Sequence, residues 1–205
     1  MLPIDGELVP IYFKRQTGKK GSVDKMDIGK IKDNEIVLVL SCADDSKKNN
    51  LGILKYLAEK SRVVAVAASQ PYEQFNGALG KDSENVFFID CITRNGWASV
   101  RKGNCIFIDN TSGLTEIGIA ITEGLSALPQ GQKYLFIDSV SGISKGANKD
   151  VFPKFAQFLA SKTREHGASG VFVSISGAMD AKMLSSLEQF CDRKVDLSKG
   201  KEGDL

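Results

Sequence analysis

A lysine-bearing polar segment, residues 41–50 (SCADDSKKNN), follows an apolar run (IVLVL) and precedes a stretch with helical spacing. A lysine between a strand and a helix is where a phosphate-binding loop would hold a nucleotide. Such a loop needs glycines, because its backbone N–H groups must converge on the phosphates without Cβ atoms in the way. The pattern GxxxxGK[ST] does not occur with either Lys47 or Lys48 in the lysine place. Asp44 and Asp45 would also repel phosphate oxygens. These residues do not favour nucleotide binding in the usual P-loop manner.

Three later apolar runs end on an aspartate: Asp90 in FFID, Asp109 in IFID and Asp138 in LFID. An aspartate that ends a parallel strand commonly caps the next turn or helix, and we favour this interpretation for most such residues. The alternative is that one of them orders a Mg²⁺ ion through water, or that carboxylates on one rim bind a divalent ion without nucleotide.

Other catalytic side chains lack the partners they would need. His166, the single histidine, comes just before Gly167 at the end of a predicted helix, where the helix dipole explains it. A histidine-dependent triad is therefore excluded, and no serine near a strand end lies in a GxSxG pattern. The cysteines are far apart, without a CxxC pair, and are interpreted as structural thiols in a reducing compartment: Cys42, Cys91, Cys105 and Cys191.

Composition and charge restrict the class of protein. The chain has 205 residues, 42% of them hydrophobic and 25% charged, and a net charge of +2. This composition is typical of one globular domain, and the charge gives no reason to expect nucleic acid or membrane as an obligatory partner. We find no secretory signal and no run of 18 apolar residues, and we expect a cytoplasmic protein. Nucleic-acid binding through Lys14, Arg15, Lys19 and Lys20 is the weakest hypothesis.

Short apolar runs alternate with stretches of helical period, which predicts a doubly wound α/β domain: a mainly parallel sheet with helices on both faces. The predicted strands are residues 36–40, 63–68, 86–89, 105–108, 134–137, 171–175 and, more weakly, 195–197. Apolar stripes predict helices from residue 51, over 114–128 (with Thr111 and Ser112 as cap candidates), from about 153 to 166, and around 183–190. Residues 1–34 are expected to form an arm or small hairpin, 35–198 the α/β domain, and 199–205 a frayed charged tail.

The order of elements resembles the RecA/KaiC-like ATPase domain, in particular the small archaeal KaiC-like proteins of the RecA superfamily. The resemblance rests on YLFIDSVSGIS in the middle of the chain and on VFVSISG followed by a helix and KVDL. The segments NVFFIDCIT, TSGLTEIGIAITEGL and FAQFLASKTREHGASGVFV are also similar to that group. It covers roughly residues 30 to 198.

The resemblance implies roles for particular positions. Asp138 matches the Walker B aspartate, which implies a contact with Mg²⁺, and the family's phosphate loop corresponds to residues 41–49, where this chain departs from it. The family's catalytic glutamate follows the second strand, where this sequence has Ala68, Ser69, Gln70 and Pro71. Losing both the loop and the base should cost several orders of magnitude in phosphoryl transfer. The hypothesis is therefore a pseudo-ATPase with a degenerate Walker A loop, for which no cofactor is expected.

Such a domain would act as a regulatory or scaffold protein through protein contacts. RecA-like domains usually assemble with neighbours of the same fold, so the resemblance implies a RecA/KaiC-like paralogue or self-association. The alternative is a nucleotide-binding ATPase or switch with a nonstandard phosphate loop. In that case Lys47, Lys48, Asn49 and Asp138 would hold ATP, with Mg²⁺ at Asp138.

Overall fold

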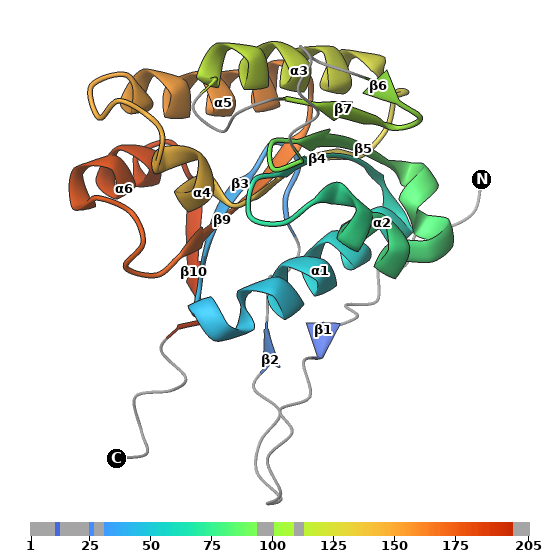
Figure 1. Ribbon diagram of the computed structural model, residues 1–205, viewed down its shortest axis with the longest axis horizontal. Helices are drawn as coiled ribbons and strands as arrows, with labels where there is room; N and C mark the ends of the chain where they lie inside the picture. The colour runs from blue at the N-terminus through green and yellow to red at the C-terminus, as the bar shows by residue number, and fades with distance from the viewer. Residues whose placement is uncertain (1–10, 13–24, 27–30, 94–100, 109–112, 199–205) are drawn as a thin grey trace, which may run out of the picture.

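The computed structural model describes residues 11–12, 25–26, 31–93, 101–108 and 113–198. An eight-stranded sheet runs through the molecule in the order β10-β3-β9-β8-β4-β5-β7-β6 (Figure 1). Neighbouring strands are parallel from β10 through β7, and β6 pairs antiparallel with β7. The strands are β3 (Ile36–Ser41), β4 (Arg62–Ala67), β5 (Val86–Asp90), β6 (Arg101–Lys102), β7 (Cys105–Phe107), β8 (Lys133–Asp138), β9 (Ser169–Ile175) and β10 (Arg193–Asp196).

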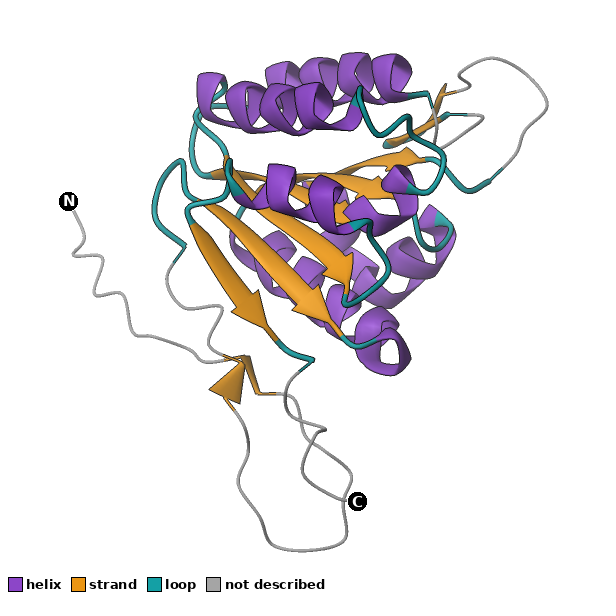
Figure 2. Cartoon of the chain, turned by 90° about the vertical axis from the view of Figure 1, so that its left-hand side faces the viewer, coloured by secondary structure: helices purple, strands orange, loops and turns teal. Residues whose placement is uncertain are grey.

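Helices cover both faces of this sheet, which confirms the doubly wound α/β prediction. Figure 1 shows α3 and α5 side by side on one face, with α1 and α2 on the other, and Figure 2 shows the same layers from the side. The helices are α1 (Ala43–Lys60), α2 (Tyr72–Leu79), α3 (Leu114–Ala127), α4 (Val140–Ser144), α5 (Phe152–Glu165) and α6 (Ala181–Glu188), with a 3₁₀ helix, η1 (Gly80–Asn85), after α2.

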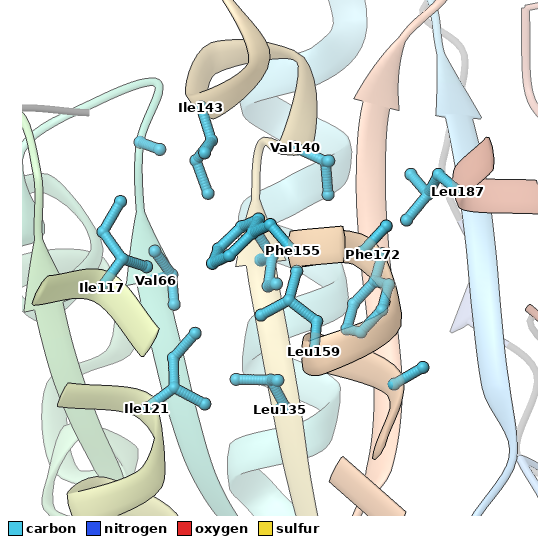
Figure 3. Packing of buried hydrophobic residues seen from close by; sticks show 14 of the residues in the cluster. Val66, Ile117, Ile121, Leu135, Val140, Ile143, Phe155, Leu159, Phe172 and Leu187 are labelled. Carbon is cyan, nitrogen blue, oxygen red and sulfur yellow. The ribbon is translucent and has the colours of Figure 1, made fainter. Parts of the chain in front are cut away.

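The sheet separates two hydrophobic layers, because β3 and β8 are buried at every position. On the α3/α5 face, Ile121, Phe155 and Leu159 pack with Leu135 and Phe172 (Figure 3). On the opposite face, side chains of α1 and α2 pack against the sheet. Strands covered on both sides read as continuous apolar runs, which is why the sequence located them to within one or two residues.

The largest difference from the sequence prediction is the start of α1. The sequence predicted a polar loop up to residue 50, but the helix begins at Ala43. No glycine or proline occurs between Ser41 and Leu51, so nothing in this stretch opposes helix formation. Asp44 and Asp45 lie in the first turn, where acidic side chains complement the helix dipole. The absence of glycine that argued against a phosphate loop thus also allows the helix to reach back to the strand.

Smaller differences concern element ends. Helix α6 ends at Glu188, before Phe190, and β10 begins at Arg193 rather than residue 195. Gly113 is the N-cap of α3. Helices α2 and α4 were not anticipated from the sequence.

Several predictions fall partly or wholly outside the described residues. Within the predicted arm, 1–34, β1 (Ile11–Tyr12) pairs antiparallel with β2 (Lys25–Met26). Among the described helices, none is long and apolar enough to cross a membrane. The predicted features that lie outside the described residues are Asp109, the cap candidates Thr111 and Ser112, the basic residues Lys14, Arg15, Lys19 and Lys20, and the tail 199–205.

Candidate functional site

Asp138 ends β8 near the middle of the sheet, between β9 and β4, and its side chain is fully buried. The carboxylate accepts a hydrogen bond from Ser69 Oγ, in the loop after β4, at 2.8 Å. It accepts a second from Asn50 Nδ2 on α1. The carboxyl end of β8 therefore joins three segments that are far apart in the chain. We refer to Asp138, Asn50 and Ser69 together as the Asp138 cluster.

The carboxyl group of Asp138 is bonded to neutral hydrogen-bond donors rather than to a cationic side chain of the described residues. No ion pair among the described residues involves Asp138, and its two donors are a neutral amide and a neutral hydroxyl. Burial raises the pKa of Asp138 from 3.8 to about 6, although the hydrogen bonds from Ser69 and Asn50 lower it. Desolvation of the charged form is therefore the dominant influence on this group.

Three of the four predicted nucleotide ligands, Lys47, Lys48 and Asn49, lie in the first turns of α1, and the fourth, Asp138, ends β8. Lys47 and Lys48 are exposed, whereas Asp138 is fully buried, so the structure does not bring these three side chains together. Asn49 is half-buried, and its Nδ2 donates to Ser41 Oγ at 3.0 Å. It is the next residue, Asn50, that reaches Asp138.

Sequence reasoning missed Asn50 and Ser69. A signal for Asn50 existed, because Ser46 and Asn50 extend the buried stripe of Ile53, Leu54 and Leu57 back by two helical turns. The stripe can be recognised only if the helix is taken to begin at Ala43 rather than at residue 51. For Ser69, the sequence offered only its place after the second strand of the domain.

The connection from β3 to α1 is too short to form a phosphate loop. Strand β3 ends at Ser41 and α1 begins at Ala43, so Cys42 alone joins them, without a side-chain cap hydrogen bond. A loop that cradles phosphates needs several consecutive backbone N–H groups turned toward the ligand. In this conformation the corresponding residues are helical instead.

The residues at this edge do not fit Mg²⁺ either. Mg²⁺ requires octahedral oxygen coordination and usually keeps several of its waters. Both oxygens of the buried Asp138 carboxylate accept hydrogen bonds, from Asn50 and Ser69. Among the residues that the structure describes, no group of three histidine, cysteine, aspartate or glutamate side chains could hold a metal ion.

Asp90, at the end of β5, acts as a cap, and both of its carboxylate oxygens accept hydrogen bonds. It is buried and accepts hydrogen bonds from the backbone N–H groups of Tyr72 (2.9 Å), Ile92 (2.7 Å) and Thr93 (2.9 Å). The hydroxyl of Thr93 donates to it as well, at 2.8 Å. Tyr72 is the first residue of α2, so Asp90 joins the start of that helix to the turn after β5. The capping interpretation is confirmed for this residue.

Helix α4 closes the carboxyl edge beside Asp138. Ser139 is the N-cap of α4, and its Oγ accepts from Gly142 N at 3.2 Å. Ser141 Oγ accepts from Ile175 N at 3.1 Å and so joins α4 to the end of β9. A Cβ on Gly142 would lie 2.3 Å from the carbonyl oxygen of Ala68. Glycine thus allows α4 to pack directly on the backbone that precedes Ser69.

His166 and the cysteines have structural environments, as predicted. His166 is the C-cap residue of α5, and its ring nitrogens contact Lys162 O at 2.9 Å and Ser126 Oγ at 3.0 Å. All four cysteines are free. Burial raises the pKa of Cys91, Cys105 and Cys191 to about 12, so these thiols stay protonated and unreactive at neutral pH.

Comparison with known protein families shows to which family the chain belongs. The model of a family of unknown function, DUF7504, matches residues 37–197, which include every strand from β3 to β10 except the first residue of β3, and the Asp138 cluster. The chain belongs to this family. No curated protein matches the DUF7504 chain.

Solved structures establish the fold of this DUF7504 member. The protein PH0250 of Pyrococcus horikoshii OT3 is similar with a TM-score of 0.57 and 14% identity, over 82% of this chain and 84% of that one. The KaiC-like protein PH0186 of the same organism has a TM-score of 0.55 and 12% identity, over 83% and 74% of the two chains. The flagellar accessory protein FlaH of Methanocaldococcus jannaschii has a TM-score of 0.54 and 10% identity, over 82% and 73%. At such identities the likeness shows the fold alone, and that fold is the RecA/KaiC-like P-loop fold.

Proposed function

We propose that this DUF7504 chain is a non-catalytic RecA/KaiC-like domain that acts as a regulatory or scaffold protein through protein contacts. The observation that carries the proposal is the direct passage from β3 into α1, with Cys42 as the single connecting residue. In this fold the phosphate loop would lie at that connection. Phosphoryl transfer depends almost entirely on positioning and charge stabilisation, and these residues supply neither for a nucleotide.

The Asp138 cluster supports the same proposal. Asp138 is the residue that would order Mg²⁺ in an active relative, but here its carboxylate is bonded to Asn50 and Ser69. Ser69 stands in the region where the resemblance would place the catalytic glutamate, and a hydroxyl without a base cannot activate water. The different use of these three positions supports the proposal that the chain does not hydrolyse ATP.

Calorimetric titration of the purified chain with ATP and with ADP, in the presence of Mg²⁺ at physiological salt, tests the proposal. We expect no binding up to millimolar nucleotide, because the residues at the position of the phosphate loop are helical and both oxygens of the Asp138 carboxylate already accept hydrogen bonds. An active RecA-family ATPase in the same buffer serves as the positive control. Micromolar binding by this chain would contradict the proposal.

The alternative function is a switch in which Lys47, Lys48, Asn49 and Asp138 hold ATP. The same titration tests it, and so does a measurement of the melting temperature with and without nucleotide. In that case nucleotide would raise the melting temperature, because a ligand that binds only the folded state stabilises it. The double substitution Lys47→Ala, Lys48→Ala would then abolish the shift. Both lysines are exposed, so this variant is expected to fold normally.

Protein partners are the second part of the proposal, and the expected partner is a RecA/KaiC-like paralogue or a second copy of the chain. Affinity purification after cross-linking, with the captured chains identified by mass spectrometry, measures this directly. We expect a P-loop paralogue or a cross-linked dimer of this chain. A strictly monomeric protein that captures no partner would argue against a scaffold role.

A further inference from the structure

Helices α3 and α5 run in the same direction and touch at two levels. At the first level, a Cβ on Gly118 of α3 would lie 2.9 Å from Phe158 Cε1 of α5. At the second, Ser126 Oγ lies 3.0 Å from His166 Nε2. Both members of the second contact come later in the chain than their counterparts in the first, so the C-terminal ends of the two helices lie together (Figure 1).

This arrangement brings two partial negative charges close to each other. The unsatisfied carbonyl groups at a helix C-terminus amount to about half an elementary negative charge, and a cation stabilises them. The last turn of α5 contains Lys162 and Arg164, whereas the last turn of α3 contains no basic residue. His166, the C-cap residue of α5, contacts Ser126 in the last turn of α3. A positive charge on His166 would therefore lie at both helix ends.

The hydrogen bonds around the ring of His166 determine where its protons are. Nδ1 lies 2.9 Å from Lys162 O, and a carbonyl oxygen only accepts, so Nδ1 carries a proton. The hydroxyl of Ser126 donates its single proton to Thr122 O at 2.7 Å, one turn earlier in α3. The oxygen of this hydroxyl therefore accepts from Nε2, which must carry a proton as well. A histidine ring with two N–H donors is the imidazolium cation.

A neutral ring makes one hydrogen bond fewer with the same neighbours. If only Nδ1 is protonated, the hydroxyl of Ser126 must turn to donate to Nε2, and it then releases Thr122 O. Only the cation makes all three bonds: from Nδ1 to Lys162 O, from Nε2 to Ser126 Oγ, and from Ser126 Oγ to Thr122 O.

Other ionisable side chains occur at these helix ends and on the segments next to them: Glu123 on α3, Lys162, Arg164 and Glu165 on α5, Lys133 at the start of β8, and Asp192 before β10. Lys162 pairs with Glu165 at 2.7 Å, and Arg164 pairs with Asp192 at 2.9 Å. No ion pair among the described residues involves His166. The helix ends and the hydrogen bonds therefore stabilise the charged ring, without a carboxylate.

We propose that protonation of His166 fastens the C-terminal ends of α3 and α5 to each other, and that loss of the proton loosens this contact. We refer to His166, Ser126 and Thr122 together as the α3–α5 clasp. Histidine ordinarily changes its charge between about pH 5 and 8, and pH sensors use such a change to alter a packed contact. Because α3 and α5 cover one face of the sheet, the clasp links the proton to the packing of that layer. This inference concerns the conformation of the chain and does not depend on the proposed function.

Nitrogen-15 NMR of the untagged chain measures the protonation state directly, because His166 is the single histidine. The two ring nitrogens resonate close together in the imidazolium ring and far apart in the neutral ring. Nuclear Overhauser contacts between the ring and the β-protons of Ser126 are followed over the same titration, from about pH 5 to about pH 8. We expect these contacts to be at least about twofold weaker in the neutral form, which makes one hydrogen bond fewer. Contacts of unchanged strength across the titration would overturn the proposal.

The substitution Ser126→Ala tests the assignment of the protons. At a pH where both forms are populated, we expect the ratio of charged to neutral ring to fall by at least about threefold, because the cation loses one hydrogen bond more than the neutral ring does. If the hydroxyl of Ser126 instead donated to a neutral ring, the same substitution would raise this ratio, so the sign of the change decides.

Ser161→Ala, at an exposed serine of α5, is the matched control and is expected to leave the ratio unchanged. Ser126 is also exposed, and alanine is the better helix former, so Ser126→Ala is expected to fold normally. The titration of the unsubstituted chain decides the proposal independently of either variant.

Discussion

Replacement of Asp90 by alanine is expected to lower the free energy of unfolding by about 3 kcal/mol or more. The carboxylate is fully buried and accepts four hydrogen bonds, three of them from the backbone of Tyr72, Ile92 and Thr93. Alanine would leave the buried N–H group of Tyr72 and the part-buried N–H groups of Ile92 and Thr93 without this acceptor, and each unpaired buried donor costs about 1–3 kcal/mol before relaxation. Urea denaturation followed by circular dichroism measures the change.

Two further variants make the Asp90 experiment specific. Asp90→Asn retains one acceptor oxygen and is expected to lose less stability than Asp90→Ala. Glu73→Ala removes an exposed carboxylate from the first turn of the same helix, α2, and is expected to change stability by no more than about 0.5 kcal/mol. If Asp90→Ala were as mild as Glu73→Ala, Asp90 would not be the cap that the structure indicates.

The stability of the protein is expected to depend on pH through Asp138. Its pKa is raised by burial to about 6 in the folded state, while an unfolded aspartate has a pKa near 3.9. Between these values the folded state binds more protons than the unfolded state, so this group's contribution to stability falls as pH rises. It is fully present below about pH 4 and is lost once pH passes about 6. A shift of two pKa units corresponds to about 3 kcal/mol.

The substitution Asp138→Asn isolates this contribution, because asparagine has nearly the same shape but does not titrate. The difference in unfolding free energy between variant and wild type is expected to change by about 2 to 3 kcal/mol between pH 4 and pH 7, in favour of the variant at the higher pH. Urea denaturation at several pH values measures it. Asp150→Asn, at an exposed position, is the control for the general effect of replacing one aspartate by asparagine. A flat difference for Asp138→Asn would mean that its carboxyl is not desolvated in the folded protein.

The sequence by itself determined the layers of this protein. Continuous apolar runs such as those of β3 and β8 predicted a parallel sheet covered on both faces, because each strand must bury both of its sides. Two caps could be predicted as well: Asp90 caps the turn that follows its strand, through the N–H groups of Ile92 and Thr93, and His166 is the C-cap residue of α5. Such features depend on neighbouring residues and on local backbone geometry, which a sequence displays directly.

Only the tertiary structure decided how the carboxyl edge of the sheet is filled. The sequence pointed to Lys47, Lys48 and Asn49, but the residue that meets Asp138 is Asn50, and Ser69 joins it from another connection. Because α1 begins at Ala43 rather than after residue 50, the helix sets the direction of each side chain in this segment. Successive side chains lie 100° apart around the axis of an ideal helix. Which one faces β8 then depends on the packing of Ile53 and Leu57, up to two turns further along the helix. The contact between Asn50 and Asp138 joins residues 88 positions apart. It depends on the order of the strands and on the rotation of α1 about its axis, and neither can be predicted from the two residues themselves.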